Sequence, residues 1–167
     1  MARDALIITR RGAYFGGRSF ARVVGRGGIT AHKREGDGAT PEGHHHIVGM
    51  LYRPDRIAAA SLPGWARGIG TRDLWSDDPD DPNYNLPVRA PHPYSHEALR
   101  RADPLYDLVL VTDWNHPLAR PGLGSAIFVH RWRGPGRATA GCVAFAAADL
   151  LWIARRIRLG AGVIVRG

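Results

Sequence analysis

The sequence predicts a mainly β domain. Only one segment has clear helical periodicity, whereas six short segments are rich in Val, Ile, Leu, Phe or Tyr and are separated by Gly-rich or Pro-rich turns. These strand candidates are Leu6–Thr9, Ser19–Val24, Ile47–Arg53, Leu105–Val111, Ser125–His130 and Gly162–Arg166. A length of 167 residues is usual for one domain. Many short strands with a single late helix therefore indicate one mainly β domain over residues 1–167.

The predicted helix runs from Ala147 to Leu159. One face of this segment is apolar at helical spacing, with Leu150, Ile153, Ala154 and Ile157. Arginines gather near its C-terminal end, where cations are favoured, and Gly160 follows as a stop signal. Ser95 is an N-cap residue type, so the structural alternative to a binding role for His96 and Glu97 is a second, shorter helix that begins there.

Charge and hydropathy limit the classes of function that this chain can have. The formal charge is +8, and all but one of the 23 basic residues are arginines. A basic domain is typical of nucleic-acid binding, but these arginines are scattered, so we predict no nucleic-acid partner. Arginine forks also suit acidic substrates. No apolar run reaches the roughly 18 residues of a membrane helix, and the N-terminal apolar stretch ends at Arg10 and Arg11. We expect a soluble chain with no transmembrane segment and no export signal.

Two long segments show neither a strand pattern nor a helix pattern. Gly25–Gly43 is rich in glycine and charge, and Trp75–Glu97 is rich in proline and aspartate. Long structureless loops in small domains are usually functional or disordered. The aromatic residues of the second segment argue against disorder, so we interpret it as a binding lid.

A single cysteine, Cys142, lies twelve residues after His130. His130 ends an apolar strand, a loop with Gly134 and Gly136 turns the chain, and Gly141 precedes the cysteine. This order can bring an imidazole to a thiol, as nucleophilic catalysis requires. Backbone N–H groups of Gly141 and Cys142 could form an oxyanion hole. The structural alternative is an edge-strand histidine and a buried cysteine that only fills space.

The run from His130 to Thr139-Ala140-Gly141-Cys142 resembles the catalytic core of the YkuD-type L,D-transpeptidases, bacterial cysteine enzymes that remodel peptidoglycan. Thr40-Pro41-Glu42-Gly43 is similar to a Thr-Pro-x-Gly element of that family. Three further segments, Ser95–Glu97, Leu105–Asp107 and Gly122–Phe128, resemble a proteobacterial branch that has Thr-Ala-Gly-Cys in place of Ser-His-Gly-Cys.

The resemblance implies a YkuD-like β-sandwich with short helices and one C-terminal helix. It implies Cys142 as nucleophile, His130 as base, Gly141 and Cys142 as oxyanion-hole donors, and Thr139 as support for the loop. The chain departs from the family pattern in three ways. Ala140 stands where a second histidine is usual, the loop is short, and Ala144 replaces a usual Asn or Arg. These departures put the substrate groove in doubt more than the cysteine chemistry.

Several other residues are candidates for binding. Arg137 and Arg133, on the loop between base and nucleophile, are candidates for holding a substrate carboxylate, and the alternative is two solvated loop arginines. The remaining substrate-binding candidates, each with a purely structural alternative, are Tyr84, His96 and Glu97. The adjacent histidines His44 to His46 cannot all face one ion from an extended strand, and no zinc spacing is present, so we expect no metal and no cofactor. We interpret this triplet as a polar turn before the Ile47 strand.

The function implied by the resemblance is transpeptidation through a cysteine thioester. The thiolate would attack diaminopimelate in a donor stem tetrapeptide and expel D-Ala, and an acceptor stem amine would complete a 3–3 cross-link, or a 1–3 cross-link through L-Ala. Carbapenem-type inhibitors are expected to acylate Cys142. The alternatives are L,D-carboxypeptidase or D-amino-acid exchange activity, a non-catalytic wall-binding module, and a nucleic-acid-binding domain. Peptidoglycan chemistry implies the periplasm, and the cytoplasm is the alternative location.

Overall fold

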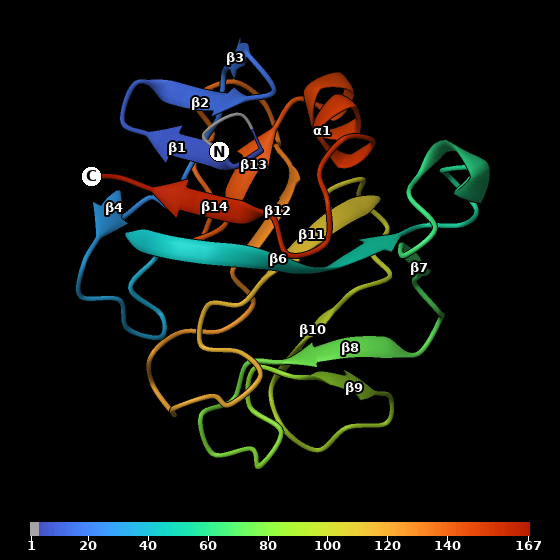
Figure 1. The fold of residues 1–167 in the computed structure, drawn as a ribbon. Helices are drawn as coiled ribbons and strands as arrows, with labels where there is room; N and C mark the ends of the chain where they lie inside the picture. Colours follow the sequence, from blue (N-terminus) through green and yellow to red (C-terminus); the bar gives the residue numbers. More distant parts are fainter. Residues whose placement is uncertain (1–3) are drawn as a thin grey trace.

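The computed structural model describes residues 4–167, and its centre is a strongly curved β-sheet (Figure 1). Of the N-terminal stretch discussed above, residues 1–3 lie outside the described residues. The strands of this sheet follow the order β13-β12-β11-β6-β14-β1-β2-β3, with β7 paired to β6. Their bounds are β1 Leu6–Thr9, β2 Gly12–Phe15, β3 Arg18–Phe20, β6 Gly43–Tyr52, β7 Arg67–Gly68, β11 Leu108–Thr112, β12 Phe128–Arg131, β13 Val143–Phe145 and β14 Gly162–Val165.

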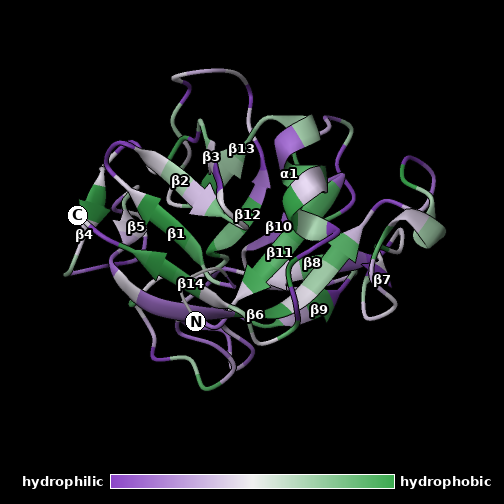
Figure 2. Ribbon diagram, turned by 45° about the horizontal axis from the view of Figure 1, so that its top comes forward, coloured by the Kyte–Doolittle hydropathy of each residue, from purple (hydrophilic) through white to green (hydrophobic). Residues whose placement is uncertain are grey.

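The curved sheet closes on itself around the main core. After β3, Val23 exchanges two 2.9 Å backbone hydrogen bonds with Ala144 of β13, which links the two ends of the strand order. Helix α1 (Ala147–Ala154) contacts β11, β12 and β13 and covers this core. The apolar colouring of β1, β14 and β11 in Figure 2 marks strands that line it. Among the largest fully buried side chains of this core are Leu6, Ile8, Ile47, Met50, Leu110, Phe145, Leu150 and Ile153.

A second, smaller core lies between the curved sheet and a three-stranded sheet of order β10-β8-β9. The three strands are β8 (Asp73–Ser76), β9 (Pro87–Arg89) and β10 (His96–Ala98). Trp75 packs edge-to-face on Phe128 of β12 with 5.0 Å between ring centroids. Cys142 belongs to this second core. The predicted nucleophile therefore lies in the layer between the two sheets.

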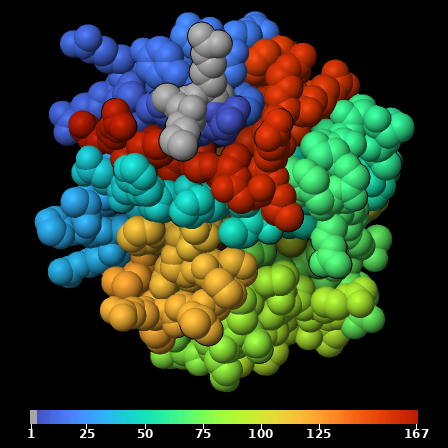
Figure 3. Space-filling model, in the orientation of Figure 1, coloured from blue at the N-terminus to red at the C-terminus, as the bar shows by residue number. Residues whose placement is uncertain are grey.

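The remaining elements are short. A two-stranded ladder of β4 (Ile29–Thr30) and β5 (Thr40–Pro41) lies within the segment 25–43, and a 3₁₀ turn, η1, spans Ala59–Ser61. Figure 3 shows the segments near residues 75–95 (green) and 115–125 (orange) covering the lower part of one face. No helix among residues 4–167 has the length and apolar character needed to cross a bilayer.

The histidine triplet is part of a strand, so its interpretation as a polar turn is wrong. His44, His45 and His46 lie in β6 and pair with Ile164, Val163 and Gly162 of β14. Strand alternation buries only the middle imidazole, which contacts the Pro41 carbonyl at 3.2 Å through Nε2. Pairing with the apolar β14 extends β6 across a stretch that has no hydrophobic pattern of its own.

The segment 75–97 is framework and not a structureless lid, which corrects a second prediction. It supplies the end of β8, all of β9 and the start of β10. The alternative helix after Ser95 is absent there, because residues His96 to Ala98 pair with Ser76 to Leu74 of β8. Ladder hydrogen bonds and burial against Phe128 outweigh the capping signal of Ser95.

The six predicted strands correspond to β1, β3, β6, β11, β12 and β14, and the sequence did not predict the other eight strands of the described residues. β1 is as predicted, β14 ends one residue earlier, β6 begins at Gly43 and is longer, and β3, β11 and β12 are shifted or shortened. Helix α1 ends at Ala154 and not at Leu159. After Ala154, the N–H groups of Arg156 and Ile157 both donate to the carbonyl of Ile153, so the last turn tightens and the helix stops.

Candidate active site

A cavity of about 290 Å³ lies beside the second core, and both predicted catalytic residues line it. His130 reaches the cavity from β12, and Cys142 reaches it from the turn that precedes β13. The two strands run parallel, with His130 opposite Ala144. The loop between them therefore carries the chain back along the sheet, and its residues form one wall of the cavity. The lining residues are Glu97, Arg101, Leu105, Tyr106, His130, Trp132, Arg133, Arg137, Ala138, Thr139, Ala140 and Cys142.

The sulfur of Cys142 is held by the backbone of the neighbouring strand. The Sγ–H group donates to the carbonyl of Ala126 at 3.1 Å, and the N–H of Phe128 donates to Sγ at 3.4 Å. The residue is only 8% exposed. Burial raises the pKa of the thiol to about 12, because a thiolate loses its hydration in this layer. Cys142 is therefore a neutral thiol in this state.

His130 presents one free ring nitrogen to the cavity. Its Nδ1 lies 2.7 Å from the carbonyl of Arg131, and since a carbonyl can only accept, Nδ1 carries the proton. Nε2 is then the unprotonated nitrogen. Burial lowers the pKa of His130 to about 4, and the Tyr106 ring packs edge-on against it at 5.3 Å. The imidazole is neutral and able to accept a proton. Within residues 4–167 no hydrogen bond joins it to Cys142.

Two threonines hold the turn before the nucleophile. Thr40 of β5 is fully buried, accepts from the N–H of Gly25 at 2.9 Å and donates to the carbonyl of Gly141 at 2.7 Å. Thr139 donates to the carbonyl of Cys142 at 2.6 Å and accepts from the N–H of Gly141 at 3.1 Å. A side chain at position 141 would bring its Cβ to 3.0 Å from the carbonyl oxygen of Ala39, and φ there is +147°. Glycine is required at this position.

The two predicted oxyanion-hole donors differ in this state. The Gly141 N–H is engaged by Thr139, whereas the Cys142 N–H has no hydrogen-bond acceptor among the described residues. The peptide joining them is trans, so a Gly141 carbonyl that points to Thr40 directs the Cys142 N–H the opposite way. Cys142 supplies the free donor of the pair.

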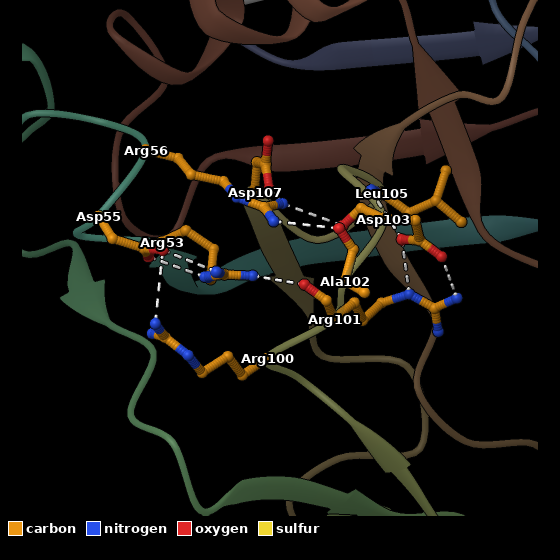
Figure 4. Close-up of polar contacts among 9 residues, drawn as sticks. All are labelled: Arg53, Asp55, Arg56, Arg100, Arg101, Ala102, Asp103, Leu105 and Asp107. Atoms are coloured by element: carbon orange, nitrogen blue, oxygen red, sulfur yellow. Dashed lines mark hydrogen bonds and ion pairs between the residues drawn. The ribbon is translucent and has the colours of Figure 1, made fainter.

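Three arginines line the cavity, and they differ in their partners. Arg101 forms a bidentate ion pair with Asp103, at 2.9 and 2.6 Å (Figure 4). Its guanidinium group also lies over the Tyr106 ring. Arg133 and Arg137 form no ion pair within the described part of the chain. The positive charge left for an anionic ligand therefore lies on the loop between His130 and Cys142.

Glu97 is the acidic residue of the cavity lining. It lies in β10, and its Oε2 accepts a 2.5 Å hydrogen bond from the hydroxyl of Tyr106. Burial, reinforced by the nearby Asp77 carboxylate, raises the pKa of Glu97 despite the Tyr106 hydrogen bond. The cavity thus combines a thiol, a neutral imidazole, two arginines without acidic partners and one carboxylate.

Comparison with known proteins places the chain in a family. The model of the YkuD family, described as an L,D-transpeptidase catalytic domain, matches residues 6–165. The chain belongs to the YkuD family. Among curated proteins none matches it.

Two solved L,D-transpeptidase structures align with this YkuD domain at low sequence identity. One is an L,D-transpeptidase from Mycobacterium smegmatis, with 12% identity, a TM-score of 0.46, and coverage of 99% of this chain and 59% of that chain. The other is L,D-transpeptidase 1 of Mycobacterium tuberculosis, with 11% identity, a TM-score of 0.43, and coverage of 98% and 61%. The YkuD chain described here spans about three fifths of the length of these two proteins.

Two residues predicted to bind substrate lie outside the cavity of this YkuD domain. Tyr84 is buried elsewhere, and its hydroxyl donates to Glu35. His96 is exposed next to Glu97 on β10, because neighbouring strand residues point to opposite faces. The cavity instead contains Arg101, Tyr106 and Trp132, which the sequence analysis did not single out. Tyr106 lies in Leu105–Asp107, a segment that carried a resemblance but no role, and no local pattern marks Arg101 or Trp132.

Thr40 contacts the turn before Cys142, and it belongs to a motif that is visible in the sequence. It lies in the Thr-Pro-x-Gly element, which carried a resemblance but no role. Its contact with Gly141 spans 101 residues of sequence, so only the fold brings the two together.

Proposed function

We propose that this YkuD chain is a peptidoglycan L,D-transpeptidase that works through a thioester on Cys142. The observation that carries the proposal is the shared cavity of Cys142 and His130, within a chain whose family is defined by this catalytic domain. The neutral state of both groups suits a mechanism in which the proton moves only when the sulfur attacks.

In the first half-reaction the Cys142 sulfur attacks the diaminopimelate carbonyl of a donor tetrapeptide. The thiol turns from the Ala126 carbonyl toward Nε2 of His130 and gives up its proton as the C–S bond forms. The oxyanion accepts a hydrogen bond from the Cys142 N–H. When the C–N bond to D-Ala breaks, His130 returns the proton to the leaving amine, and a thioester remains. No charge or proton is left over in this half-reaction.

Arg137 and Arg133 provide the carboxylate subsite in this proposal. Both line the cavity, and neither has an acidic partner within residues 4–167. Guanidinium forks bind carboxylates in bidentate fashion, and the donor stem carries such groups. Because their loop joins His130 to Cys142, a substrate carboxylate bound there keeps the scissile carbonyl next to the sulfur.

In the second half-reaction an amine of another stem attacks the thioester and forms the cross-link. Diaminopimelate as acceptor gives a 3–3 bond and L-Ala gives a 1–3 bond. The peptidoglycan substrate places this reaction in the periplasm. Water or a free D-amino acid as acceptor would make the protein an L,D-carboxypeptidase or an exchange enzyme.

The test is intact-mass analysis of the protein mixed with disaccharide-tetrapeptide, together with mass spectrometry of the products. We expect a transient acyl-enzyme, released D-Ala and a dimeric product. Cys142→Ala removes the only nucleophile of the proposal, so it should lose turnover and also the single adduct expected from a carbapenem, while its unfolding transition stays close to wild type.

Turnover above a few per cent of wild type in well-folded Cys142→Ala would refute the thioester mechanism. Release of D-Ala without a dimer would assign the protein to the carboxypeptidase class instead. Binding of wall fragments with no D-Ala release in any condition would indicate a non-catalytic module.

A further inference from the structure

The cavity is divided by charge into an acidic side and a basic side. Glu97 extends from β10, whereas Arg133 and Arg137 lie on the loop between β12 and β13. One oxygen of Glu97, Oε2, is bound by Tyr106, and the other, Oε1, receives no hydrogen bond from the described residues. Arg101, which also lines the cavity, is already paired with Asp103. Glu97 therefore offers a free carboxylate oxygen and forms no ion pair among residues 4–167, although the charge of Arg101 acts on it from a greater distance.

Besides burial, the charges of two more carboxylates, Asp77 and Glu35, act on Glu97 and raise its pKa. Asp77 follows β8, next to β10, and its Oδ1 is buried with no hydrogen-bond donor among residues 4–167. Glu35 accepts from the hydroxyls of Tyr84 and Ser125. Within the described residues none of these three carboxylates forms an ion pair. The side of the cavity formed by Glu97 thus has an excess of negative charge that an external cation can neutralise.

This charge is unfavourable for the first half-reaction. Glu97 and the Cys142 sulfur are close enough that the carboxylate opposes formation of the thiolate. After acylation the sulfur is part of a neutral thioester, and this opposition disappears. A carboxylate at this position then has a favourable partner only if a cation enters beside the thioester.

We propose that Glu97 is the acceptor subsite: it binds the ammonium group of the incoming stem peptide and removes one proton from it before attack. The inference rests on the proposed function and specifies its second half-reaction. An ammonium ion has no lone pair, so it must lose a proton before it can form a bond to the thioester carbon. The raised pKa of Glu97 makes its carboxylate a stronger base for this purpose.

The second half-reaction then balances. The ammonium gives one proton to Glu97, the amine nitrogen bonds to the thioester carbon, and the C–S bond breaks. The second N–H proton passes to Nε2 of His130 and from there to the Cys142 sulfur. The products are an amide and a neutral thiol, and the proton on Glu97 leaves to solvent.

Glu97→Gln tests the proposal, because glutamine keeps the shape and still accepts from Tyr106 but carries no charge. The measurements are the burst of D-Ala from donor alone, and the ratio of cross-linked to hydrolysed product as acceptor concentration rises. We expect the burst to be unchanged or faster, and the rate of transfer to the amine to fall at least about tenfold. Glu97→Asp should recover part of the transfer rate.

Glu42→Gln is the matched control, because Glu42 is exposed, lies outside the cavity and loses the same charge. It should leave both measurements unchanged. If the D-Ala burst and the transfer rate fall equally in Glu97→Gln, Glu97 only supports the site. If the product ratio is unchanged, Glu97 does not bind the amine. Either result overturns this inference but leaves the proposed function intact. Absence of an acyl-enzyme in wild type would refute the proposed function itself.

Discussion

Cys142 and His130 are both neutral because both are buried, and a backbone partner holds each of them in place. The thiol donates to Ala126 and the imidazole donates to Arg131, so neither depends on the other for its position. A preformed thiolate–imidazolium pair would require the opposite pKa shifts, with the thiol lowered and the imidazole raised. In the proposed mechanism Cys142 is therefore not a preformed thiolate, and its reactivity develops when substrate turns the sulfur toward His130.

We predict that the rate of alkylation of Cys142 by iodoacetamide reaches no plateau as the pH rises through neutrality. With a thiol pKa of about 12, the thiolate fraction rises with pH, so the rate should increase about tenfold per unit from pH 7 to pH 9. Glutathione is the control, because its rate levels off near its own, lower pKa. A rate that is already constant below pH 8 would reveal a preformed ion pair.

At the scale of elements, three segments distant in sequence meet at the nucleophile turn. β5 supplies Thr40, the turn after β3 supplies Gly25, and the chain entering β13 supplies Gly141. Gly25 has no room for a side chain, since an added Cβ would lie 2.2 Å from the carbonyl oxygen of Gly38. This close contact keeps the 25–43 segment compact, and the Arg26 N–H joins it to the turn by donating to the Thr139 carbonyl at 2.9 Å. The Thr40 hydroxyl then sets the orientation of the Gly141–Cys142 peptide.

We predict that Thr40→Val slows acylation of Cys142 while Thr40→Ser restores it. Valine has the same shape but leaves the Gly141 carbonyl and the Gly25 N–H without their partner, at a cost of about 1–3 kcal/mol in free energy of unfolding. Without its partner the peptide can rotate, and the Cys142 N–H is no longer aimed at the oxyanion. D-Ala burst rates and urea unfolding check both effects. A valine variant that loses stability but acylates at the wild-type rate would limit Thr40 to a structural role.

A second set of contacts holds the segment that leads to Tyr106. Arg53 donates to the carbonyl of Arg101 at 2.5 Å, and Arg56 bonds the carbonyls of Ala102 and Asp103 and the carboxylate of Asp107 (Figure 4). These bonds join the chain after β6 to the segment before β11. These contacts lie outside the cavity, and they hold the segment that forms one of its sides.

For the whole molecule, the buried histidines make stability depend on pH in a defined window. Burial lowers the pKa of His130 to about 4 and also lowers that of His45. As the pH falls below about 6.5, the unfolded chain binds protons that the folded chain does not, so the free energy of unfolding falls until about pH 4. Asp55 and Asp103, whose pKa values are lowered to about 2 by their arginine partners, contribute losses only below about pH 4.

We predict that His130→Gln flattens the upper part of this profile. Between pH 7 and pH 4 wild type should lose up to about 3 kcal/mol through His130, and the variant should not show this component. Urea unfolding at pH 7, 5.5 and 4.5 measures the difference, and the loss below pH 4 should be the same in both proteins. Identical profiles above pH 4 would mean that His130 is not buried as a neutral group.

The sequence by itself determined the mainly β class, the late helix α1 and the positions of β1 and β14. It also placed His130 and Cys142 a short distance apart along the chain, and both line one cavity. These features depend on local patterns, namely short apolar segments, helical spacing and turn residues. The same reasoning failed at the histidine triplet and at residues 95–98, where pairing with β14 and with β8 overrides the local signals.

Only the tertiary structure decided which other side chains reach the cavity. Glu97 faces it and His96 does not, because the register of β10 on β8 selects one of the two faces. Thr40 meets Gly141 across 101 residues because the curved sheet closes between Val23 and Ala144. Strand pairing and burial are properties of the whole chain, and a local sequence pattern contains neither the register nor the partner.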